Sequence, residues 1–146
     1  MAFNKTITSA NSALTIMVTG IFPAPVPIQG YAMDSAFQNE AIQSAEVTMG
    51  IDGTMSAGFT FKEVKQKITL SPDSPSKELF DAWYTAMFFA KEVIFAEATL
   101  MLPSTNESYV FVRGVLTSYH GAPSGKKKLE PVEYEITWQS ISKASL

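Results

Sequence analysis

The sequence contains no cysteine, a single histidine and few charged residues. Charged residues make up 17% of the 146 residues, whereas about 25% is typical of soluble domains. Without cysteine, the chain has no disulfide, no thiolate nucleophile and no cysteine-based metal site. The net charge is −3. It argues against tight nucleic-acid binding, because such binding relies on basic side chains that neutralise phosphates.

Long apolar runs are missing as well. No run approaches the roughly 18 residues that a membrane-spanning helix needs. The first residues also lack the charged start and apolar core of a secretion signal. The length suits one domain rather than two. We therefore expect a single domain over residues 1–146, made in the cytoplasm and not inserted in a membrane, with residues 1–11 as a flexible arm.

Apolar residues, by contrast, are abundant. They account for 46% of the chain, and ten Phe, five Tyr and two Trp are among them. A monomer of this size has too few charges to surround so many large apolar groups, which indicates that part of the surface is buried between subunits. A monomer with an unusually neutral surface is the alternative.

The clearest local pattern is the alternation in Ser44–Phe61. Odd-numbered residues are apolar on both sides of an Asp52-Gly53 step, and even-numbered residues are small and polar except for Glu46. Strict alternation predicts two half-buried strands with one wet face. A two-residue turn would pair Ile51 with Thr54 and place apolar beside polar side chains. We therefore expect a three-residue loop at Asp52–Thr54, or a bulge.

Further patterns predict the rest of the sheet. Pro23, Pro25 and Pro27 predict an extended segment outside any strand ladder, because proline lacks the backbone donor. After Phe61 the apolar positions become even-numbered, which predicts a bulge or tight turn at Lys62-Glu63. Other expected strands lie at Ala13–Thr19, Val64–Leu70, Ile94–Leu102, Tyr109–Tyr119 (apolar on both faces) and Val132–Gln139, with a short strand or turn within Tyr31–Phe37.

One helix is expected over about residues 75–90. Ser74 is suited to cap it and Pro75 to occupy its first turn. Leu79, Phe80 and Trp83 begin an apolar stripe at helical spacing. Tyr84, Phe88 and Phe89 widen this stripe, so the helix either lies deep between sheet and loops or contacts a neighbouring subunit. Together these elements predict a mainly β fold, an antiparallel sandwich or partial barrel of six to eight strands with one helix.

Candidate catalytic and ligand-binding groups are sparse. His120 lies in a glycine- and lysine-rich loop, without a suitably spaced acid, and Glu133 and Glu135 alternate on the polar side of a strand. No glycine pattern follows a strand and opens a helix to hold phosphate. We therefore expect no enzyme activity, no cofactor and no metal site. Lys126–Lys128 are expected either to be solvated or to pair with an acidic patch on a neighbouring subunit.

Several segments resemble tail tube proteins of contractile-tailed bacteriophages, and the resemblance covers most of the chain from about residue 12. They are Ala45–Ser56 (AEVTMGIDGTMS), Ser71–Tyr84 (SPDSPSKELFDAWY), Arg113–Tyr119 (RGVLTSY) and Tyr134–Gln139 (YEITWQ). The resemblance implies hexameric rings that stack into a hollow tube. The inner sheets of the subunits would join in one barrel around a lumen that carries DNA. It also implies sheath and baseplate proteins as partners, location in the virion tail and assembly in the host cytoplasm.

The resemblance also assigns roles to particular residues. Small hydroxyls, glycines and a few acids suit a DNA channel, because lysines would bind phosphate and stall passage. Lumen-lining candidates are Ser44, Glu46, Thr48, Ser56 and Thr60, with Asp52 at or near a ring rim. Inter-subunit candidates are Pro23, Pro25, Pro27, Tyr84, Phe88, Phe89, Lys126, Lys127 and Lys128. The N-terminal arm, the proline segment and the Pro103–Ser108 turn are candidates for inter-ring or sheath contact.

Two alternative functions stay open. A baseplate or tail-terminator ring protein would have the same fold as a tube subunit. A small-ligand binding β-barrel belongs to a different class, and its aromatic residues would line an internal pocket.

Overall fold

The computed structural model describes residues 12–28, 37–103, 105–122, 125 and 129–145. Within them the chain forms nine strands and one helix. In chain order these are β1 (Ala13–Val18), β2 (Phe22–Pro27), β3 (Phe37–Asn39), β4 (Ala45–Met49), β5 (Met55–Phe59), β6 (Val64–Leu70), α1 (Lys77–Ala90), β7 (Ala96–Leu102), β8 (Glu107–Ser118) and β9 (Val132–Ser145). The expected antiparallel, mainly β class with one helix is confirmed. The described strands exceed the expected number because β2 and the short β3 also pair.

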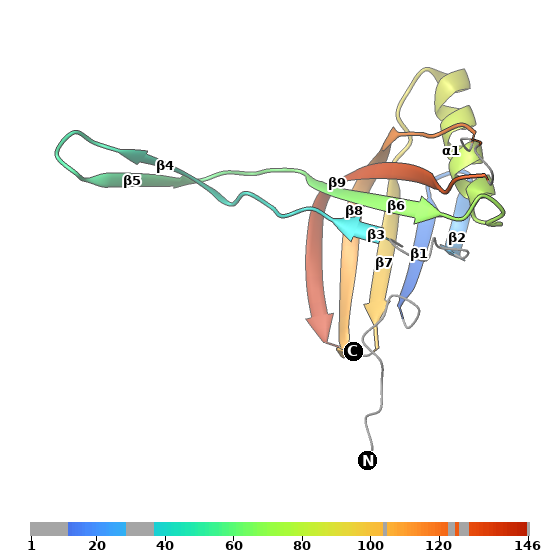
Figure 1. Cartoon of the computed structure of the whole chain (residues 1–146), viewed down its shortest axis with the longest axis horizontal. Coiled ribbons are helices and arrows are strands. Elements are labelled where there is room, and N and C mark those ends of the chain that lie inside the picture. Colours follow the sequence, from blue (N-terminus) through green and yellow to red (C-terminus); the bar gives the residue numbers. More distant parts are fainter. Residues whose placement is uncertain (1–11, 29–36, 104, 123–124, 126–128, 146) are drawn as a thin grey trace, which may run out of the picture.

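Seven strands form one sheet in the order β2-β1-β7-β8-β9-β6-β3. The long β9 joins its two halves. Val132–Trp138 pair with β6, whereas residues 135–145 pair with β8. Figure 1 shows that β9 bends, so that β6 crosses the direction of β7 and β8. The sheet is therefore strongly curved, an open partial barrel within a single chain.

The core lies between the concave side of this sheet and α1. Alternate residues of β1, β6, β7 and β9 point into it, as their period-two patterns predict. The helix contributes Leu79, Phe80 and Trp83, which are fully buried. Phe80 stacks on Tyr134 with ring centroids 4.2 Å apart, and the Trp83 indole N–H donates to the Ile94 carbonyl at 2.8 Å. Burial of each such large side chain contributes about 1.5–3 kcal/mol to folding.

The helix starts later than expected. Ser74 accepts a hydrogen bond through Oγ from the Ser76 amide at 3.2 Å, but Pro75 and Ser76 form a turn and the N-cap residue is Ser76. The expected cap at Ser74 and first turn at Pro75 were therefore two residues early. At its other end Lys91 adopts a left-handed conformation, with φ of 58°, and its amide donates to the Met87 carbonyl at 2.9 Å.

The proline segment pairs with β1, so the expectation that it lies outside the ladder was wrong. β2 is an edge strand, where missing donors are tolerated. Pro27 faces Thr15, and the neighbouring Ile28 amide donates to β1 at 2.8 Å. Between the pairs Ile16–Val26 and Val18–Phe22 the register shifts. Pro23 and Pro25 lie in that bulge, so none of the three prolines is needed as a ladder donor.

After Phe61 the apolar positions change from odd-numbered to even-numbered residues. The cause is not the expected bulge or tight turn. Residues 60–63 belong to no strand and link β5 to β6. They run as an extended connection between the β4–β5 pair and the main sheet (Figure 1). The phase changes because β5 and β6 belong to different sheets.

Candidate functional site

The β4–β5 hairpin is a two-stranded sheet that projects away from the rest of the chain (Figure 1). Ala45 faces Phe59, and Met49 faces Met55. The Gly50 amide donates to Thr54 at 2.8 Å, and the Gly53 amide donates back to Gly50 at 3.0 Å. The loop is thus the three residues 51–53, with Gly53 in the left-handed region at φ 85°.

The structure confirms the expected loop length of three residues, but the loop lies one residue earlier in the chain than expected. A three-residue loop was expected at Asp52–Thr54, with Ile51 opposite Met55, whereas Met49 stands opposite Met55. Both registers keep the apolar residues of the two strands on one side. Asp52 accepts a hydrogen bond from the Thr54 amide at 3.0 Å, and this bond lowers the pKa of its carboxyl group.

One side of the hairpin is apolar and uncovered. We call it the apolar face, and it consists of Ala45, Val47, Met49, Met55, Ala57 and Phe59. Phe59 retains 71% of its accessible surface, and its ring meets that of Phe61 edge to face with centroids 4.9 Å apart. The expectation of half-buried strands was therefore wrong for the single chain. The linkers carry both strands beyond the core, so the chain itself does not cover them.

The opposite side gathers the expected lumen-lining residues. Glu46 faces Gly58 and Thr48 faces Ser56, while the Thr60 amide donates to the Ser44 carbonyl at 3.0 Å. We call this side the polar face, and Asp52 lies in the loop at its tip. Residues 44–61 contain no lysine or arginine, so this face bears only neutral and acidic side chains.

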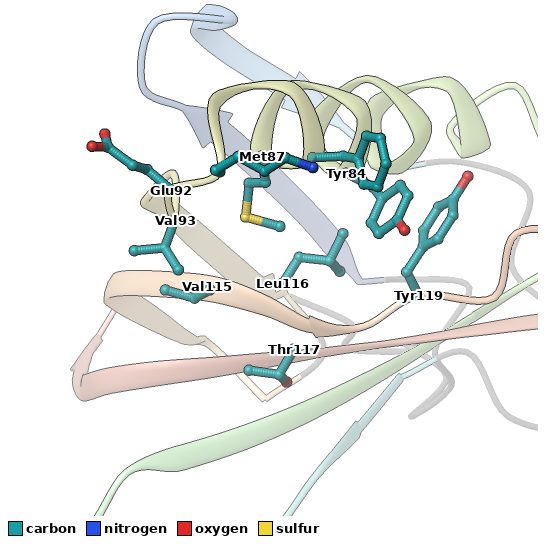
Figure 2. Close-up of a pocket in the computed structure, with 10 residues that line it drawn as sticks. Tyr84, Met87, Glu92, Val93, Val115, Leu116, Thr117 and Tyr119 are labelled. Carbon is teal, nitrogen blue, oxygen red and sulfur yellow. The ribbon is translucent and has the colours of Figure 1, made fainter.

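A second apolar surface lies at the C-terminal half of α1. Tyr84, Phe88 and Phe89 are 40%, 54% and 77% exposed, so this side of the helix is not sunk between sheet and loops. Beside it is a groove of about 470 Å³, shown in Figure 2. This α1 groove is lined by Tyr84, Met87, Phe88, Lys91, Glu92, Val93, Val115, Leu116, Thr117 and Tyr119.

Aromatic contacts fix one end of the α1 groove. Tyr84 stacks on Tyr119 with centroids 4.2 Å apart, and the Tyr119 hydroxyl donates to Asp81 at 2.5 Å. Burial, together with this hydrogen bond, raises the pKa of Tyr119 to about 12. Lys91 places its Nζ 4.0 Å from the centroid of the Phe88 ring, a cation–π contact that covers only one side of that ring.

Sequence reasoning identified Tyr84, Phe88 and Phe89 but not the β8 side of the α1 groove. Val115 and Leu116 belong to β8, and Val93 follows the helix. The available signal was the expected strand Tyr109–Tyr119, which is apolar on both faces. An ordinary half-buried strand needs only one apolar face.

The other expected inter-subunit residues lie neither on the hairpin nor at the α1 groove, or they fall outside the described residues. Pro23, Pro25 and Pro27 lie together on the edge strand β2, away from the β4–β5 hairpin. Lys126, Lys127 and Lys128 lie outside the described residues, as do the arm over residues 1–11 and most of Tyr31–Phe37. Of the Pro103–Ser108 segment, Pro103, Thr105 and Asn106 lie in the turn between β7 and β8, Glu107 and Ser108 already belong to β8, and Ser104 lies outside the described residues.

Within the described residues, no group of three or more histidine, cysteine or acidic side chains is placed to hold a metal ion. None of the helices in that part of the chain is long and apolar enough to cross a membrane. The described residues of the site present two apolar surfaces and one small polar face, an arrangement that suits contacts between proteins.

Residues 5–142 match the family described as "Tail fiber protein gp32". The chain belongs to this family. No curated protein matches the gp32-family chain.

Solved structures share the fold of this gp32-family chain. A chain of the PVC sheath–tube complex, an extracellular contractile injection system in the extended state, matches with a TM-score of 0.66 and 13% identity, over 98% of this chain and 94% of that one. The tube-terminating cap of the anti-feeding prophage matches with a TM-score of 0.65 and 9% identity, over 100% and 95%. Its baseplate matches with a TM-score of 0.59 and 13% identity, over 99% and 98%. The expected likeness to contractile tail tubes is confirmed at the level of the fold.

Proposed function

We propose that the protein is a structural subunit of a bacteriophage tail tube. In this proposal its copies form hexameric rings that stack into a hollow conduit through which double-stranded DNA passes. Sheath and baseplate proteins would be its partners, with assembly in the host cytoplasm and residence in the virion tail. The shared fold with chains from sheath–tube, cap and baseplate structures supports a non-enzymatic, structural role.

The observation that carries this proposal is the β4–β5 hairpin. A two-stranded sheet on its own is marginally stable in water, and here its apolar face is bare. Assembly would cover that face. The polar face, which lacks basic side chains, would then be available to line a channel. Phosphates would be repelled by Glu46 and Asp52 and would find no lysine to bind.

A terminator or baseplate ring is the second candidate. The cap and baseplate chains match over nearly their whole length, with TM-scores close to that of the sheath–tube chain. A tube subunit should stack without limit, whereas a terminator should form single rings or cap a tube. Electron microscopy of the purified protein at high concentration distinguishes long tubes from isolated rings. A strictly monomeric protein would argue against both functions.

A small-ligand barrel has less support. The largest aromatic residues of the core pack on one another rather than around a space. Phe111 and Trp138, for example, have ring centroids 5.3 Å apart. The α1 groove opens at the surface instead of the barrel interior.

The lumen assignment is tested by reversing one charge on the polar face. Glu46→Lys places a cation where DNA would pass, so particles should assemble but eject DNA more slowly. Glu40→Lys is the matched control, since it makes the same charge change at an exposed position outside the hairpin strands. Equal ejection rates for both variants, measured on assembled particles, would exclude the polar face from the lumen.

A further inference from the structure

Exposed large apolar side chains concentrate in two places on the described chain. One group lies on the β4–β5 hairpin and includes Val47, Met55 and Phe59. The other lies at the end of α1, where Phe88 and Phe89 are exposed. Large exposed apolar patches in soluble proteins mark sites that bind other proteins. One chain therefore carries two separate binding surfaces.

The apolar face of the hairpin is large enough to matter energetically. Val47, Met49, Met55 and Phe59 of this face, and Phe61 beside it, are each at least 56% exposed. Together they expose on the order of 500 Å², if a full large side chain contributes about 150 Å². Each partner in a standard protein interface buries roughly 800 Å². The apolar face together with Phe61 therefore supplies more than half of one partner's share of such an interface.

The α1 groove offers a surface of matching chemistry. Figure 2 shows that Met87 of α1 and Leu116 of β8 point toward each other across it, with Val93 and Val115 at one end. Tyr84 is already held against Tyr119 by stacking. Little side-chain freedom would be lost there on binding. An apolar concavity bordered by fixed aromatic rings suits the anchoring side chains of another protein.

The two surfaces of one molecule cannot meet each other. In Figure 1 the hairpin extends from one end of the chain, while α1 lies at the opposite end of the long axis. A contact between them must therefore join two copies. Such a contact is heterologous, because different surfaces meet, and repeated contacts of this kind generate closed rings or helical filaments.

We propose that the apolar face of the β4–β5 hairpin of one copy packs in the α1 groove of the next copy. This inference rests on the proposed self-assembly and names the contact that produces it. Anchoring residues are Met55 and Phe59 on the hairpin, and Phe88 and Val93 at the groove. The contact covers both apolar surfaces at once and leaves the polar face of the hairpin free.

The test uses the natural absence of cysteine. Met55→Cys protein and Phe88→Cys protein are prepared separately, mixed, and oxidised under non-denaturing conditions. The mixture should give disulfide-linked dimers that contain one copy of each variant. Each variant alone should give few. Thr48→Cys, on the polar face of the same hairpin, replaces Met55→Cys in a control mixture and should not cross-link.

Other occupants give different products. Efficient dimers from Met55→Cys alone would mean that hairpins pair with each other, and dimers from Phe88→Cys alone would mean that grooves do. Either result overturns the inference. Rings or tubes of the unmodified protein in electron micrographs, without a Met55–Phe88 cross-link, would overturn the contact while leaving the proposed function intact. A protein that never assembles would overturn both.

A second measurement does not depend on cross-linking. Phe59→Ala should raise the concentration needed for assembly at least about tenfold, as expected for a central interface anchor. Thr48→Ala should leave that concentration unchanged. Both side chains are exposed in the single chain, so the thermal unfolding of the monomer should be the same for both variants. Equal assembly by the two variants would contradict the inference.

Discussion

Gly114 on β8 lies directly against the indole of Trp138 on β9. The two residues are paired across the strands, and a Cβ atom on Gly114 would overlap the six-membered ring of Trp138. Trp138 is fully buried and donates through Nε1 to Gln66 at 3.1 Å, so its ring has little room to move. A side chain at position 114 must therefore displace the core.

We predict that Gly114→Ala lowers the free energy of unfolding by about 1–3 kcal/mol, the usual cost of overpacking a core. The melting temperature should fall by several degrees, at roughly 2–4 °C per kcal/mol for a chain of this size. Gly58→Ala is the control, because a Cβ atom there meets nothing within 4 Å. Circular dichroism melts of both variants check this, and equal melting temperatures would contradict it.

The ion pair of Glu107 and Lys143, at one end of the sheet, should contribute less to folding stability in acid. Lys143 Nζ lies 2.7 Å from the Glu107 carboxylate, and the hydrogen bond between them lowers the pKa of Glu107 to about 2. A lowered folded-state pKa adds stability above the ordinary value near 4.5, and this stability is lost as the pH falls toward 2. The effect is small because both side chains are partly exposed.

In Lys143→Met, stability should depend less steeply on pH below about 4.5 than in the natural protein. Urea midpoints measured from pH 5 to pH 2 would detect the difference. Parallel curves for the two proteins would show that this pair does not contribute.

The contribution of Tyr119 to folding stability should have the opposite pH dependence, because it is lost at alkaline pH. Its pKa of about 12 lies above the ordinary value of 10.0. The folded state therefore holds the phenol proton more tightly than the unfolded state does. The resulting stability is present below pH 10 and is lost as the pH rises through 12. Tyr119→Phe keeps the aromatic ring but has no phenol, so its urea midpoint should fall less between pH 9 and pH 12.

Alternation in the sequence correctly predicted which residues share a face. It predicted that the even-numbered apolar residues of β6 share a face, and Val64, Ile68 and Leu70 are all buried. It also required a loop with an odd number of residues between β4 and β5, and the structure has a loop of three residues. Both results follow from the fixed period of a strand, which depends only on local geometry.

Alternation could not predict what covers each face. The apolar residues of β4 and β5 have the same pattern as those of β6, yet they are exposed in the single chain. The difference arises from the linkers, whose direction depends on contacts far along the sequence. The prediction from the prolines, that residues 23–27 lie outside any strand ladder, was wrong for a similar reason. An edge strand with a bulge tolerates prolines that a central strand excludes.

The proline edge of β2 leads to a further prediction. Pro23, Pro25 and Pro27 leave this exposed edge poor in backbone donors, so another strand cannot extend the sheet there. Replacing all three by threonine should restore N–H groups and promote irregular edge-to-edge association. Sedimentation velocity should then detect heterogeneous aggregates. Ser140→Thr on the exposed part of β9 adds a threonine without a new donor and should not aggregate. A triple variant as dispersed as this control would mean that the prolines do not protect the edge.

The loop of three residues at 51–53 keeps the apolar residues of β4 and β5 on one face of the hairpin. Deleting Gly53 shortens the loop to two residues, which forces β4 and β5 into a register that mixes apolar and polar side chains on each face. Self-assembly should weaken at least about tenfold, because one continuous apolar face no longer forms. The melting temperature of the monomer should stay unchanged, since β4 and β5 are exposed along their length. Gly53→Asn keeps the loop length, and asparagine tolerates the left-handed conformation that Gly53 adopts, so this variant should assemble normally. Normal assembly of the deletion variant, measured by sedimentation over a concentration series, would show that the apolar face of the hairpin is not needed for contact between copies.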